Sequence, residues 1–126
     1  MKTCVVTANF ECNANKVWLY LSNPNLNHWR TDVKNVEISD DGMQQTENNN
    51  DGSVTQVVFS EKEKPRRIAC TFSKGRVNGS FIGILLGGGE ATSVECTMQI
   101  GGIGLFKKPQ KLLEERMEML RKALGQ

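Results

Sequence analysis

The chain has 126 residues, a length typical of one domain, so we expect a single domain over residues 1–126. Hydrophobic residues make up 38% of the chain, which is enough for a packed core and excludes a disordered or low-complexity protein. The 16 Lys and Arg residues nearly balance the 14 Asp and Glu residues, and both signs are spread along the chain, so we expect no nucleic-acid partner.

The apolar runs are all short. None approaches the roughly 18 residues that cross a bilayer, and the first residues lack the apolar segment of a signal peptide. We therefore expect no stable membrane insertion, a cytoplasmic location and four reduced cysteines. These cysteines (Cys4, Cys12, Cys70 and Cys96) are far apart and the chain has one histidine, so we expect no metal site and no cofactor.

The chain begins with a strand over residues 2–10, which is rich in β-branched side chains. A helix follows, with Asn13 as its cap and its apolar residues at Ala14, Val17, Trp18 and Leu21. The helix ends before Pro24, because a proline disfavours helical geometry in the residue before it. A second helical turn over residues 25–29 would complete a short helical corner.

Regularly spaced turn signals, including Asp-Gly and Asn-Gly dipeptides, divide the next part of the chain. They predict six strands, at about residues 33–40, 43–48, 53–61, 66–73, 79–86 and 90–100. Since no long helical pattern interrupts them, the connections are hairpins and the sheet is an antiparallel meander.

Two of these strands alternate cleanly between apolar and polar residues, which predicts one dry face and one wet face. Ile68, Cys70 and Phe72 share one face of the first strand, and the residues from Val94 to Ile100 alternate in the same way. We expect no titratable side chain on the dry face. The strand over residues 80–86 is apolar on both faces, so either a partner covers its outer face, as in a homodimer, or the strand twists at Gly83.

The chain ends in a helix over about residues 107–124. Pro109 suits its first turn, and Leu113, Met117, Leu120 and Leu124 form one apolar stripe. This stripe matches the dry face of the sheet, so the sheet should curl around the helix in an α+β fold, with the helical corner at one end.

Several short motifs along the chain belong together. They are Val17, Trp18, Leu21, Ser22 and Pro24, then Trp29, then Asp32, Val33, Val36 and Glu37, then Pro65 to Ile68, and Ala91 to Val94. This set resembles the START-like helix-grip superfamily (SRPBCC), which includes polyketide cyclase/dehydrase-type, pollen-allergen-like and coenzyme Q-binding proteins. The resemblance spans about residues 5–122. It implies a seven-stranded antiparallel sheet that grips a long C-terminal helix, with a cavity between them.

Apolar side chains could line that cavity and form a site for a lipophilic molecule. The candidate ligand-binding residues are Trp29, Val57, Phe59, Phe72, Phe81, Met98, Phe106, Leu113, Met117 and Leu120. The same residues could instead fill a solid core. Trp29 could line the ligand or lock the helical corner onto the sheet.

The function that we expect is the binding of a hydrophobic small molecule or lipid-like metabolite, with no catalytic residue. Two alternatives stay open. One is a cyclase- or dehydratase-like enzyme that would use His28, Thr71 or Asp32. The other is a partner-binding module that would use the basic terminal helix or the strand near Phe81.

Overall fold

The computed structural model describes residues 1–23, 29–104 and 108–126. In these residues the elements are β1 (Lys2–Phe10), α1 (Ala14–Ser22), β2 (Val33–Ile38), β3 (Gln44–Asn49), β4 (Val54–Glu63), β5 (Arg67–Lys74), β6 (Val77–Gly88), β7 (Ala91–Gly101) and α2 (Pro109–Ala123). The predicted α+β class is confirmed, with bounds close to those expected from the sequence.

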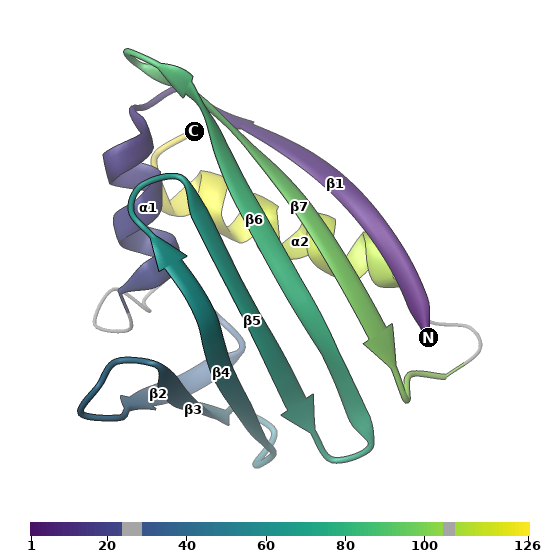
Figure 1. Cartoon of the computed structure of the whole chain (residues 1–126). Helices are drawn as coiled ribbons and strands as arrows, with labels where there is room; N and C mark the ends of the chain where they lie inside the picture. The colour runs from purple at the N-terminus through teal and green to yellow at the C-terminus, as the bar shows by residue number, and fades with distance from the viewer. Residues whose placement is uncertain (24–28, 105–107) are drawn as a thin grey trace.

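The strands form one open antiparallel sheet in the order β1-β7-β6-β5-β4-β3-β2 (Figure 1). Strands β2 to β7 follow one another as the predicted meander. The first strand, β1, pairs along its whole length with the last strand, β7. The segment that includes α1 therefore connects one edge of the sheet to the other. The predicted turn over residues 25–29 lies outside the described residues apart from Trp29.

Helix α1 begins and ends as its sequence indicates. The side chain of Asn13 caps it by accepting a 3.0 Å hydrogen bond from the backbone N–H of Lys16. Val17 and Trp18 are buried, which confirms that this face of the helix belongs to the core.

Helix α2 packs against β1 and β7 on the inner, concave face of the sheet. Pro109 is its first residue, and the predicted stripe of Leu113, Met117, Leu120 and Leu124 is buried. Met117 also meets the sheet directly, because its Sδ lies 3.8 Å from the Sγ of Cys96 on β7.

The two apolar faces of strand β6 differ in their burial. Leu85 is buried on the concave face, whereas Ile82 and Ile84 lie on the outer face and stay partly exposed. The hairpin to β7 closes after the pair Gly88 and Ala91, so Gly89 and Glu90 form its turn. Gly89 has the positive φ (65°) that such a tight turn needs at its first position.

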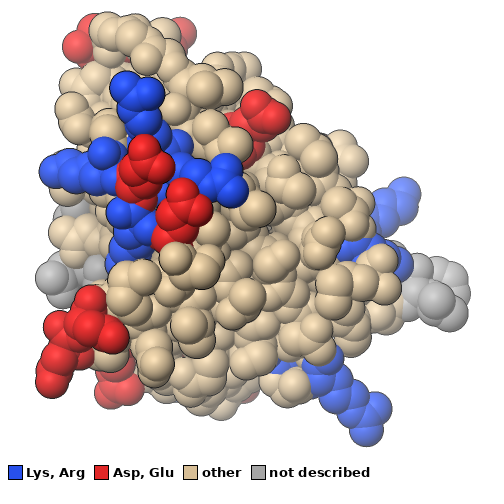
Figure 2. Space-filling model, in the orientation of Figure 1, with Lys and Arg blue, Asp and Glu red and all other residues tan. Residues whose placement is uncertain are grey.

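The outer face of the sheet carries few charges. In Figure 1 the strands pass in front of α2, so this face points toward the viewer, and Figure 2 shows few Lys, Arg, Asp or Glu side chains over its middle. Val5, Val58 and Leu86 are exposed apolar residues on this face.

The first prediction concerns the contact between α2 and the sheet. Leu120 is 0% exposed, so Leu120→Ala should lower the free energy of unfolding by about 2–5 kcal/mol through lost burial and the cavity left behind. Leu112→Ala, on the same helix at a residue 43% exposed, should change it by less than about 0.5 kcal/mol. Urea unfolding measures both, and equal losses would contradict the packing described.

Candidate functional site

The strand register brings the predicted ligand-binding residues of the sheet to its concave face. Val57 on β4 pairs with Phe72 on β5, and Phe81 on β6 pairs with Met98 on β7. Phe59 lies on this face as well, and Leu113, Met117 and Leu120 face it from α2. These eight residues therefore belong to one apolar cluster, while Phe106 and His28 lie outside the described residues. Their role in ligand binding stays a prediction.

This apolar wall is unevenly covered. Phe59, Met98 and the α2 stripe are buried. Cys70, Phe72 and Phe81, which share the same face, are only partly buried. Helix α2 packs on β1 and β7 and helix α1 packs on β6 and β7, yet these three residues of β5 and β6 stay partly exposed.

Trp29 connects the segment after α1 to the rest of the core. Its ring is buried and its Nε1 donates a 3.0 Å hydrogen bond to the backbone carbonyl of Tyr20. The guanidinium of Arg30 lies 5.7 Å from the centre of the Trp29 ring. These contacts favour the role in which Trp29 locks this segment in place.

A buried ion cluster joins the start of β2 to β3 on the concave face. The guanidinium of Arg30 donates to all four oxygens of two carboxylates, at 2.9 Å to each oxygen of Asp32 and at 3.1 Å to each oxygen of Glu47. Gln45 adds a 3.0 Å hydrogen bond to Glu47. Forked, charge-assisted bonds of this kind hold both partners in one geometry.

Ion pairing determines the protonation of this cluster. Burial alone would raise the pKa of Asp32, but hydrogen bonds from Arg30 and the charges of Arg30 and Arg116 outweigh it and lower the pKa to about 2. Burial is likewise outweighed at Glu47, whose pKa is lowered by Arg30 and Arg116. Burial also opposes the charge of Arg30, yet its two carboxylate partners raise its pKa. All three groups are therefore ionised at neutral pH.

A second arginine, Arg116, reaches toward this cluster from α2. Its Nη2 lies 3.6 Å from Asp32 Oδ2, an oxygen that already accepts from Arg30. The Arg116 side chain is 40% exposed, yet desolvation and the like charge of Arg30 lower its pKa to about 10. Desolvation disfavours the charged form of this guanidinium even though part of its side chain is exposed.

These charges correct one expectation from the sequence. The dry face was expected to carry no titratable group, and that prediction is wrong, because Arg30 and Glu47 are buried on it. Of the residues considered for an enzyme, Asp32 belongs to the cluster and Thr71 is exposed on the outer face. The burial of Glu47 could not be predicted from strand β3, because its sequence, QQTENN, has no apolar alternation that would reveal an inner face.

The four cysteines are unpaired thiols. Burial raises the pKa of Cys96 to about 12 and, together with the charge of Glu47, raises that of Cys70 to about 11. Both thiols are thus protonated at neutral pH and are weak nucleophiles. Among the described residues, no group of three or more His, Cys, Asp or Glu side chains is arranged to hold a metal ion.

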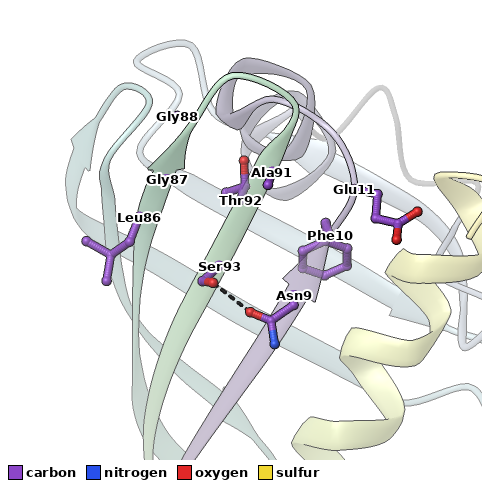
Figure 3. Close-up of a pocket in the computed structure, with 9 residues that line it drawn as sticks. All are labelled: Asn9, Phe10, Glu11, Leu86, Gly87, Gly88, Ala91, Thr92 and Ser93. Carbon is purple, nitrogen blue, oxygen red and sulfur yellow. Dashed lines mark hydrogen bonds between the residues drawn. The ribbon is translucent and has the colours of Figure 1, made fainter.

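A shallow recess of about 380 Å³ lies elsewhere, at the ends of β1, β6 and β7 (Figure 3). Its lining includes Asn9, Leu86 and Ser93, and Ser93 donates a 2.6 Å hydrogen bond to Asn9. None of the predicted ligand-binding residues that the structure describes lines it. Nor is either described helix long and apolar enough to cross a membrane.

No family model matches the chain, and no curated protein matches it. Solved structures do match it over nearly its whole length. A START superfamily protein from Mycobacterium smegmatis superposes with a TM-score of 0.74 at 16% identity, covering 97% of this chain and 93% of the other. The XoxI protein from Bacillus cereus gives a TM-score of 0.76 at 15% identity, covering 98% and 95%.

An uncharacterised protein from Bacillus thuringiensis gives a TM-score of 0.77 at 14% identity, covering 99% of this chain and 100% of the other. At these identities the likeness concerns the fold alone. The chain has the START-like helix-grip fold, as the sequence motifs predicted.

The second prediction tests the buried ion cluster. Glu47→Gln keeps the shape of the side chain but leaves Arg30 with one carboxylate, so it should lower the free energy of unfolding by about 3 kcal/mol. Glu61→Gln breaks the partly exposed pair with Arg67 and should cost less than about 1 kcal/mol. Urea unfolding at neutral pH compares them, and similar losses would mean that the buried cluster contributes no more than a surface pair.

The third prediction concerns acid. The pKa of Asp32 is about 2 in the folded protein against an ordinary 3.8, so its stabilisation is present above about pH 4 and is lost as the pH falls through 2. In Asp32→Asn the free energy of unfolding should fall less steeply over this range than in the wild type. Asp40→Asn, at an exposed carboxylate, should follow the wild-type curve. Parallel curves for wild type and Asp32→Asn would contradict the shift.

Proposed function

We propose that the protein binds a hydrophobic small molecule or lipid-like metabolite on the concave face, between the middle strands and α2. The observation that carries this proposal is the partial exposure of Cys70, Phe72 and Phe81 on the concave face, next to the buried Phe59 and Met98. Inward-facing aromatic side chains that stay partly exposed are typical of a site for an apolar ligand.

The ion cluster supports binding over acid–base catalysis. Asp32 and Glu47 have lowered pKa values, and Arg30 occupies every oxygen of both carboxylates. A general acid or base at neutral pH needs a pKa near that pH and a free position for the proton. Neither carboxylate offers this, so the enzymatic alternative gains no support from them.

Location and assembly stay predictions from the sequence. The four free thiols fit the cytoplasmic location that we expect. The homodimer would use the outer face of β6 and its neighbours, where Val58 and Leu86 are exposed and no described element covers them.

The fourth prediction uses N-phenyl-1-naphthylamine, a neutral apolar fluorophore, as the probe. It should bind saturably with one site per chain and increase in fluorescence. Cys70 is a weak nucleophile, so its slow alkylation by N-ethylmaleimide is followed over an extended time course at mildly alkaline pH, with and without the probe. Occupancy should slow it further, because Cys70 lies among the partly exposed residues. Peptide mass spectrometry identifies the modified thiol.

Two variants locate the probe. Cys70→Phe fills space on the concave face and should weaken binding, whereas Leu86→Ser, on the outer face and beside the shallow recess, should not. A wild-type protein that binds no probe, or a probe that leaves the alkylation of Cys70 unchanged, would contradict the proposal.

A further inference from the structure

We infer that Arg116 is the anchor for an anionic head group, so that the ligand is a lipophilic carboxylate with its chain along the apolar wall. This inference rests on the proposed function and specifies the chemical class of the ligand.

The first step is that the two arginines are not equivalent. Arg30 is buried, and its Nε, Nη1 and Nη2 all donate to Asp32 or Glu47. Arg30 therefore holds two carboxylates in place, and each of its three guanidinium nitrogens is already engaged with at least one of them.

Arg116 has the opposite character. Among the described residues its one ion pair is the 3.6 Å approach to Asp32 Oδ2, and no hydrogen bond from its guanidinium to them is seen. Both carboxylates of the cluster already give all their oxygens to Arg30. The guanidinium N–H donors of Arg116 therefore lack close acceptors within the described part of the chain.

The second step is the position of Arg116. On α2 it lies three residues after Leu113 and four before Leu120, both buried, so its side chain leaves the helix at the flank of the apolar stripe. It points across to the start of β2, where Asp32 lies. On the sheet, Cys70 pairs with Phe81 and lies on the same face as Phe72.

The third step is the match between this arrangement and one kind of ligand. A planar guanidinium binds a carboxylate through two parallel hydrogen bonds, and partial desolvation strengthens such bonds. Apolar side chains of β5 and β6, Phe72 and Phe81, stand on the same face for the chain of the molecule. A lipophilic carboxylate uses both features, whereas a purely apolar molecule uses the apolar wall alone and makes no bond to Arg116.

The fifth prediction compares decanoate with decan-1-ol as competitors of N-phenyl-1-naphthylamine. They share a chain length and differ in the charge of the head group. Arg116→Gln should weaken decanoate binding about tenfold or more, since a hydrogen bond to a charged group is lost, and change decan-1-ol binding less than about twofold. Lys111→Gln makes the same change in net charge at an exposed residue of α2 and should leave both affinities unchanged.

A second variant changes affinity in the opposite direction. Asp32→Asn removes the carboxylate that competes for Arg116, so decanoate should bind more tightly than to the wild type while decan-1-ol does not. Because Asp32→Asn also frees Nε and Nη2 of Arg30, the gain supports the inference only if it is absent from the double variant Asp32→Asn/Arg116→Gln.

The outcomes separate the two proposals. If the wild type binds the fluorophore and decan-1-ol but not decanoate, or if Arg116→Gln affects both competitors equally, the anionic anchor is wrong and the apolar site stands. Unchanged or weaker decanoate binding by Asp32→Asn also contradicts the anchor. If neither the fluorophore nor any competitor binds the wild type, the proposed function itself fails.

Discussion

The concave face of the sheet is larger than the helix that covers it. Helix α2 buries Leu113, Met117 and Leu120 against β1 and β7, and this contact closes one half of the core. Pairing along the sheet decides which side chains of β5 and β6 face inward, whether or not the helix reaches them. Phe72 and Phe81 are therefore inward-facing residues without full cover. The stability of the fold and the accessible apolar wall follow from the same placement of one helix.

The ion cluster stabilises the opposite edge of the sheet, where β2 and β3 lie. Strand β3 has few apolar side chains, so it cannot hold β2 and the start of the sheet in place by burial alone. The bonds from Arg30 to Asp32 and Glu47 add a side-chain connection to the antiparallel pairing of the two strands. Arg30 carries one positive charge against two carboxylates, and Arg116 lies near the remaining negative charge, 3.6 Å from Asp32 Oδ2. The two arginines therefore differ in geometry, because the four carboxylate oxygens accept hydrogen bonds from Arg30 and Arg116 makes the longer contact.

The sequence could predict those elements whose side chains alternate or form a stripe. The alternation around Ile68 and Cys96 identified the inner face of β5 and β7, and the spacing of Leu113 and Leu120 identified the buried side of α2. The charged cluster could not be predicted in this way. Arg30 is buried because Glu47, seventeen residues away, completes its hydrogen bonds, and such long-range pairing leaves no periodic pattern in the sequence.

The environment of Arg116 could not be predicted from a periodic pattern either. In a helix with acidic and basic neighbours it reads as one more solvated charge, yet its place between Leu113 and Leu120 puts it at the edge of the buried stripe. Long cationic side chains at such an edge lay their stem on apolar surface and project the charged group beyond it. Here that group stays partly exposed and lies 3.6 Å from a carboxylate that already accepts from Arg30. The position of Arg116 relative to the stripe can be read from the sequence, but its carboxylate neighbour comes from the segment before β2, and no helical spacing reveals it.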